Sequence, residues 1–293
     1  MTRTITKERL PYHPQLGRHV RHDSESRRYA YDTSGLALVS TKHTRRIPVL
    51  DQGQLGSCTG NAGIGCLGTD PFYATIPSRV QPLLVAQGAY PFTEAGAVEL
   101  YSDATAADDY PGQYPPTDTG SDGISIAKVL KAHGQISGYQ HTFSLQDALL
   151  ALTQTPFITG TNWYQGMFDA DPDGRVHPGG DLAGGHEYVA DQLDVEQQRI
   201  WFTNSWGTGF GIDGRFYLTW DDFGTLLGQQ GDVTVFTPLT QPAPTPTPVP
   251  DTDPADAALA AVAHPWVRHL HTDIAHNREM QAATKAWLAA KGL

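Results

Sequence analysis

The chain has 293 residues, of which 39% are hydrophobic, enough to bury the core of one large domain or two small ones. Its formal net charge is −11, but residues 1–48 hold ten Lys/Arg against four Asp/Glu, whereas residues 49–255 hold six against twenty-four. Such an acidic body argues against a nucleic-acid partner.

The N-terminal segment shows no targeting or membrane signal. It lacks the apolar core of a secretory leader, and no run of the chain approaches the ~20 apolar residues that a membrane span needs. We therefore expect a cytoplasmic protein with no membrane partner. Residues 1–44 are polar and basic, which predicts an extended N-terminal arm with short structured pieces. Two placements stay open for this arm: a solvated tail, or a strap on the acidic body.

The domain expected over residues 45–237 begins with a helical pattern. Residues 58–68 predict a helix, although its four glycines are poor helix formers and suggest close backbone packing against a sheet. Further helices are expected around 95–101, over 123–133, and over 145–153 behind a Ser144 cap.

The second half of this domain has strand-like periodicity. Strands are expected at 157–160, 187–193, 200–204 and 215–219, so that helices precede strands as in an α+β fold. Residues 238–254 hold seven prolines in seventeen positions and predict a semi-rigid linker. Residues 255–293 predict a C-terminal amphipathic helix that docks on the body, self-associates or attaches to a partner, the last two being favoured by the linker.

Four residues in distinctive settings suggest thiol chemistry on a carbonyl. Cys58, at the expected start of a helix, is the candidate nucleophile, because a helix N-terminus favours the thiolate. His186 follows two glycines and precedes a strand, and is the candidate base. Asn204 would orient the His186 ring, and Gln52 would supply a side-chain N–H to the oxyanion.

The segments around these residues resemble the papain family of cysteine peptidases. Gln52–Cys58 matches its Gln-Gly-x-x-Gly-Ser-Cys signature, and Asn204-Ser-Trp-Gly with Gly211, Gly214 and Tyr217 matches its second signature. The resemblance covers roughly residues 45–237 and is strongest to the compact bacterial and tailed-phage members. It implies a two-lobed α+β fold, with a helical lobe and an antiparallel sheet or barrel lobe, and a cysteine endopeptidase acting on protein or peptide substrates. It also implies that the arm can lie near the cleft, as propeptides do.

The resemblance assigns further roles and shows three departures. Trp206 would shield the His186–Asn204 bond from water, and Gly120 or Gly123 would pair with substrate backbone. Thr59 stands where the family often has Trp, Glu187 where it usually has Ala, and Leu55 where papain has a disulfide-bonded cysteine. The last departure fits a reducing compartment. Cys66, two turns after Cys58, is expected to be a buried helix residue.

No metal or cofactor is expected. The acidic stretch 169–181 starts like a calcium loop, but its twelfth position is Gly180 rather than glutamate, so we interpret it as an acidic turn. Two other functions stay open: a peptidoglycan-cleaving Cys/His hydrolase, and a structural or binding component of a phage particle, which would make the protein virion-associated.

Overall fold

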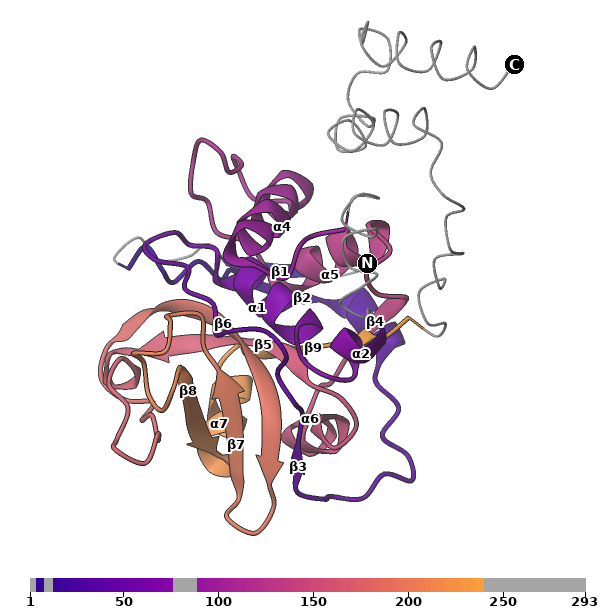
Figure 1. Ribbon diagram of the computed structural model, residues 1–293, viewed down its shortest axis with the longest axis vertical. Helices are drawn as coiled ribbons and strands as arrows, with labels where there is room; N and C mark the ends of the chain where they lie inside the picture. The colour runs from indigo at the N-terminus through magenta and orange to yellow at the C-terminus, as the bar shows by residue number, and fades with distance from the viewer. Residues whose placement is uncertain (1–3, 8–12, 76–88, 240–293) are drawn as a thin grey trace, which may run out of the picture. The chain divides into compact units, whose positions relative to one another are not determined.

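A computed structural model describes residues 4–7, 13–75 and 89–239. The predicted C-terminal helix 255–293 lies outside these ranges, as does the Pro-rich linker 238–254 except for its first two residues. The described arm and body belong to one compact unit (Figure 1). Among the described residues, no helix is both long and apolar enough to cross a bilayer.

Helices dominate the first half of the body, as predicted. They are α1 (Cys58–Leu67), α2 (Phe72–Thr75), α4 (Glu94–Ala107) and α5 (Gly123–Ala132). Side chains cap two of them: Thr93 accepts a backbone N–H at the start of α4, and Asp122 does so at the start of α5. All ten residues of α1 are buried, which makes it the central helix.

The glycines of α1 explain how it is buried, and they correct one expectation. A side chain at Gly60 would collide with Ala97 and Tyr101 of α4, and one at Gly63 with the side chains of Leu100 and Ile126. These glycines therefore let α4 and α5 approach closely. The predicted packing of glycines against a sheet holds only for Gly65, which faces a valine of the neighbouring strand.

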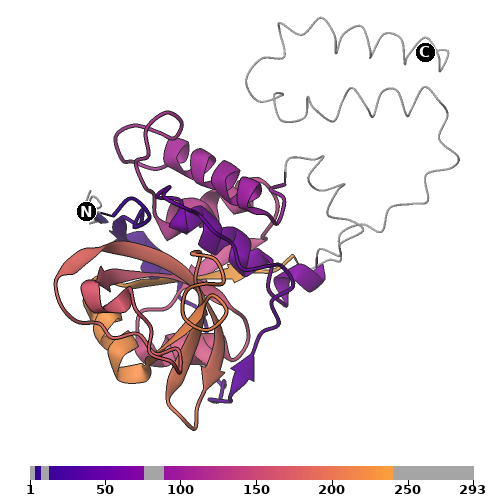
Figure 2. The ribbon, with the colours of Figure 1, turned by 60° about the vertical axis from the view of Figure 1, so that its left-hand side comes forward.

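A seven-stranded antiparallel sheet forms the second half. It comprises β4 (Gly138–His141), β9 (Asp232–Thr237), β5 (Phe157–Tyr164), β6 (Leu182–Asp194), β7 (Arg199–Thr203) and β8 (Arg215–Thr219) in that order, with β3 (Thr41–Lys42) beside β6. Helix α1 packs on β5 and β6, whereas α6 (Leu145–Leu152) contacts β6, and α7 (Trp220–Gly228) contacts β5, β7 and β8. In Figure 2, α1 and α4 again lie on one side of the strands. The helical region beside an antiparallel sheet confirms the predicted α+β class.

The N-terminal arm is a strap rather than a solvated tail over its described residues 13–44. It contains β2 (Val20–Asp23), which pairs with β1 (Thr4–Lys7), then the 3₁₀ helix η1 (Ser24–Tyr29) and β3. Leu16 is fully buried in the apolar core of the sheet half, and Arg18, His19 and Arg21 are buried as well. Residue 44 therefore marks a change of sequence character within one packed unit.

Candidate active site

Cys58 is the first residue of α1 and is fully buried. Its position places the thiol at the positive end of the helix dipole, where backbone N–H groups favour an anion. The second cysteine, Cys66, lies at the other end of the same helix, and neither forms a disulfide. Burial raises the pKa of the Cys66 thiol well above its ordinary value, so Cys66 is the inert helix residue expected from the sequence.

The structure brings His186 and Asn204 together. His186 lies in β6, and Asn204 follows the last residue of β7, the strand that pairs with β6. The His186 Nε2–H donates to Asn204 Oδ1 at 2.7 Å, and the backbone N–H of Ser205 donates to the same oxygen at 2.8 Å. Because Nε2 carries the proton, neutral His186 has its lone pair on Nδ1. Among the described residues, that Nδ1 has no hydrogen-bond partner.

Aromatic rings enclose the His186–Asn204 pair. The Trp206 ring stacks on the His186 ring with centroids 4.7 Å apart, and the Trp163 ring meets it edge-on at 5.0 Å. Both His186 and Asn204 are buried. Burial lowers the pKa of His186 to about 4, against the opposing effect of the Asn204 hydrogen bond, so the ring is neutral at pH 7 in this structure. Trp206 thus lies on one face of the His186 ring, and its role in shielding the His186–Asn204 bond stays a prediction.

Gln52 is held beside Asn204 by Ser205. The Gln52 backbone N–H donates to the Ser205 carbonyl at 2.9 Å, and the Ser205 hydroxyl donates to Gln52 Oε1 at 2.6 Å. With Oε1 fixed, the amide group presents its two N–H bonds to the carbonyls of Leu55 at 2.7 Å and Gln15 at 2.9 Å. Leu55 belongs to the same loop, but Gln15 belongs to the N-terminal arm. One donor of Gln52 is therefore aimed at a peptide carbonyl of another segment.

The arm crosses the site as an extended peptide. The Arg18 N–H donates to the carbonyl of Gly185, the neighbour of His186, at 3.1 Å. On the opposite side, the Ser121 N–H donates to the Gly17 carbonyl at 2.9 Å, and the His19 N–H donates to the Ser121 carbonyl at 2.8 Å. Residues 17–19 thus bridge the two halves, with parallel pairing on both sides.

Sequence reasoning missed Ser121 as the backbone that pairs with a bound strand. It lies between Gly120 and Gly123, the two glycines that the resemblance suggests for pairing with substrate backbone. Gly120 adopts a positive φ of 75° and donates its N–H to the Tyr101 hydroxyl, while Gly123 begins α5 and contacts Glu187. The two glycines shape this edge, and their role in substrate binding stays a proposal.

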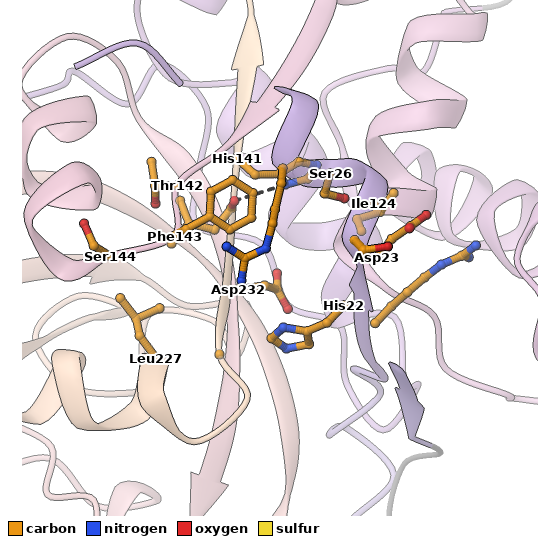
Figure 3. Close-up of a pocket in the computed structure, with 15 residues that line it drawn as sticks. His22, Asp23, Ser26, Ile124, His141, Thr142, Phe143, Ser144, Leu227 and Asp232 are labelled. Carbon is orange, nitrogen blue, oxygen red and sulfur yellow. Dashed lines mark hydrogen bonds between the residues drawn. The ribbon is translucent and has the colours of Figure 1, made fainter. Parts of the chain in front are cut away.

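A pocket of the described structure lies away from Cys58. It has a volume of ≈ 450 Å³ and lies where η1 and the end of β2 face β9, with His22, Arg27, His141 and Phe143 in its walls (Figure 3). Two residues before Cys58, by contrast, the arm lies against the body: Gly17 is so close to the backbone of Gly56 that a side chain there would collide with it.

No metal centre is found among the described residues, since no three His, Cys, Asp or Glu side chains gather closely enough to hold an ion. In the acidic turn, Asp173 accepts from the Tyr217 hydroxyl at 2.6 Å, and Asp171 lies 2.7 Å from His177 Nε2. These carboxylates already have protein partners.

Comparison with solved structures identifies the architecture. The chain is similar to xylellain, a cysteine protease from Xylella fastidiosa, with 18% identity, 72% of this chain and 91% of that chain covered, and a TM-score of 0.53. It is similar to procathepsin L 3 of Tenebrio molitor larval midgut at 14% identity, 77% coverage of each chain and a TM-score of 0.51. The fold is papain-like. At such identities the likeness extends to the fold alone; no protein-family model and no curated protein matches the sequence.

Proposed function

We propose that the chain is a cysteine peptidase that hydrolyses peptide bonds, with Cys58 as nucleophile, His186 as acid and base, and Asn204 as the residue that orients the base. The observation that carries this proposal is the buried Nε2–H···Oδ1 bond between His186 and Asn204, which leaves the Nδ1 lone pair available. A neutral imidazole with this tautomer is the form that accepts a thiol proton. The helix that begins at Cys58 packs on β6, the strand that carries His186.

The proposed reaction has two stages. In the first, the Cys58 thiol gives its proton to His186 Nδ1, and its sulfur attacks the peptide carbonyl carbon. The C–N bond then breaks as His186 returns the proton to the leaving amine, which leaves a thioester. In the second stage, His186 takes a proton from water, the hydroxide attacks the thioester, and the C–S bond breaks to regenerate the thiol. Asn204 keeps the ring in one tautomer throughout.

Gln52 is proposed as an oxyanion donor. In the structure, one of its amide N–H bonds donates to the Gln15 carbonyl, a peptide carbonyl of the arm. This contact supports the assignment because that oxygen stands in for a substrate carbonyl oxygen. Once the arm leaves, the same N–H is available to the negative oxygen of the tetrahedral intermediate, where one such donor is worth ~3 kcal/mol. The Leu55 and Ser205 bonds would keep the amide in place.

The proposed enzyme is latent in this conformation. Residues 15–19 take the hydrogen-bond partners that a substrate needs, namely the backbone of Gly185 and Ser121 and the side-chain amide of Gln52. Peptide hydrolysis therefore requires the arm to lift away or to be cut. We expect the intact chain to cleave slowly until the arm is displaced.

Active-site substitution tests the proposal. A peptide library is incubated with the full chain, with Cys58→Ala and with Cys66→Ala, each with and without a thiol alkylator. Cleavage that Cys58→Ala abolishes and Cys66→Ala retains is expected, since Cys66 is buried at the far end of α1. Equal cleavage by Cys58→Ala contradicts the proposal. Clearing of purified cell walls with all peptides intact would instead favour a peptidoglycan hydrolase.

A further inference from the structure

The side chain of Arg18 occupies a closed acidic pocket directly beside the candidate active site. Its backbone pairs with Gly185, next to His186, and its guanidinium is fully buried. Arg18 Nη2 forms an ion pair with Asp232 and donates to the Gln230 carbonyl at 2.7 Å. A fully buried arginine is rare unless a site is built for it, because removing the charge from water is costly.

The second acid of this pocket is Glu187, which follows His186 in β6. It is fully buried, and among the described residues neither carboxylate oxygen has a hydrogen-bond partner. Burial and the neighbouring Asp232 raise the pKa of Glu187, and the positive charge of Arg18 opposes this rise. For Arg18, burial works to lower the pKa, but Asp232 and Glu187 outweigh it and the pKa is raised. Both acids therefore favour the charged guanidinium, and Arg18 favours the charged form of Glu187, whereas Asp232 opposes it.

Glycines make the room for these groups. A side chain at Gly160 would collide with both Arg18 Nε and Glu187 Oε2, and one at Gly123 would collide with Glu187 Oε1. A side chain at Gly185 would meet the Arg18 backbone carbonyl. The walls on three sides thus belong to the papain-like body, and only the occupant belongs to the arm. When the arm leaves, the body keeps a pocket with two carboxylates and no cation.

We propose that this pocket selects the substrate: it takes the arginine side chain of a peptide bound across Gly185 and Ser121, and Glu187 and Asp232 determine the specificity. The inference rests on the proposed peptidase function and names its substrate class, peptides with an arginine within a few residues of the cleaved bond. A long side chain with a planar, forked donor group fits Asp232 and the Gln230 carbonyl together, which favours arginine over lysine. Glu187, which stands where the papain family usually has Ala, thereby gains a role in substrate selection.

Paired substrates test this specificity. Peptides that contain arginine are compared with the same peptides containing citrulline, which keeps the shape and loses the charge. For the full chain, kcat/KM is expected to be at least about tenfold higher for arginine, since a site with buried polar groups rejects an analogue that leaves them unpaired. Glu187→Gln and Asp232→Asn should each lower the ratio of kcat/KM for the arginine peptide to kcat/KM for the citrulline peptide. The double variant should bring this ratio within about threefold of unity. Equal rates for both peptides, or an unchanged ratio in the double variant, overturn the inference.

A binding measurement keeps the two proposals separable. In the full-length Arg18→Ala chain the pocket loses its occupant, and agmatine, a free guanidinium side chain, is expected to bind there and raise the melting temperature. The effect should be absent from wild type and from Arg18→Ala/Asp232→Asn. If no peptide is cleaved but agmatine binds in this pattern, the peptidase proposal is contradicted and the arginine-binding pocket is supported. If Cys58-dependent cleavage is seen without agmatine binding or arginine preference, the arginine-binding pocket is contradicted and the peptidase proposal is supported.

Discussion

Ser205 fixes the side chains of two candidate site residues at once. Its backbone N–H donates to Asn204 Oδ1, and its hydroxyl donates to Gln52 Oε1. Since each amide side chain has its oxygen occupied, the orientation of both is determined. Asn204 is left to accept from His186, and Gln52 to donate toward the arm. A single serine thereby connects Asn204, the proposed orienting residue, with Gln52, the candidate oxyanion donor.

The burial of His186 predicts a pH-dependent stability. An exposed histidine has a pKa near 6.5, whereas the folded value is about 4. Between these values the unfolded chain binds a proton that the folded chain does not, so the free energy of unfolding falls as pH drops from about 6.5 to 4. The expected loss is up to about 3 kcal/mol.

This contribution is isolated by comparing wild type with His186→Gln in chemical denaturation at several pH values. As pH falls from 7 to 4, wild type should lose stability relative to His186→Gln. The other titrating groups act equally on both proteins, so they cancel in the difference between the two free energies of unfolding. A difference that stays constant over this range would mean that His186 is solvated and unshifted in the folded protein.

The sequence predicted the candidate site unevenly at the residue scale. Cys58, His186, Asn204 and Gln52 stand in short signatures, so local sequence identifies them. Arg18 and Asp232, by contrast, form one ion pair across 214 residues of chain. No local pattern encodes such a pair, because it depends on how the arm is laid over β9. The charge contrast between arm and body left a solvated tail and a strap both open, and only the fold assigns partners.

Helix α1 illustrates how packing overrides helix propensity at the element scale. Its glycines cost up to ~1 kcal/mol each relative to alanine in an isolated helix. In the fold, Gly60 faces the Ala97 carbonyl and Tyr101 at distances that leave no space for a methyl group. The close contact between α1 and α4 therefore depends on the missing side chain.

Replacement of this glycine should destabilise the protein. Gly60→Ala is expected to lower the free energy of unfolding by about 1–3 kcal/mol, because overpacking outweighs the gain in helix propensity. The matched control is Gly228→Ala in the last position of α7, where a methyl group meets nothing within 4 Å. That variant should be neutral or slightly stabilised in thermal unfolding. Two variants with the same stability would contradict the packing argument.

Elements with their own strong pattern were predicted, and those that need a partner were not. The helix behind Ser144 and the strands β7 and β8 agree with expectation to within a residue or so. Strand β4, Gly-Tyr-Gln-His, has only one buried residue and lies at an edge of the sheet, so its sequence carries little strand signal. It forms because β9 supplies its hydrogen bonds.

At the scale of the whole molecule, the arm and the body are joined by charge as well as by strands. Arg18 pairs with Asp232 of the sheet half, and Arg21 pairs with Asp109 and Asp122 of the helical half. The arm therefore contacts both halves. Immediately before the first anchor, Gly17 approaches the backbone of Gly56 so closely that a Cβ atom there would collide with it.

This approach predicts an activating substitution. A methyl group in Gly17→Ala would collide with the backbone of Gly56, which cannot move aside as a flexible side chain can. A steric cost of about 1–3 kcal/mol confined to the arm-bound state should shift the arm toward release and raise peptide hydrolysis by the full chain roughly tenfold or more. Gly179→Ala, at a site with nothing within 4 Å, should leave the rate unchanged. Because the substitution leaves Cys58, His186 and Asn204 intact, a rate equal to wild type would show that the arm does not limit access to them.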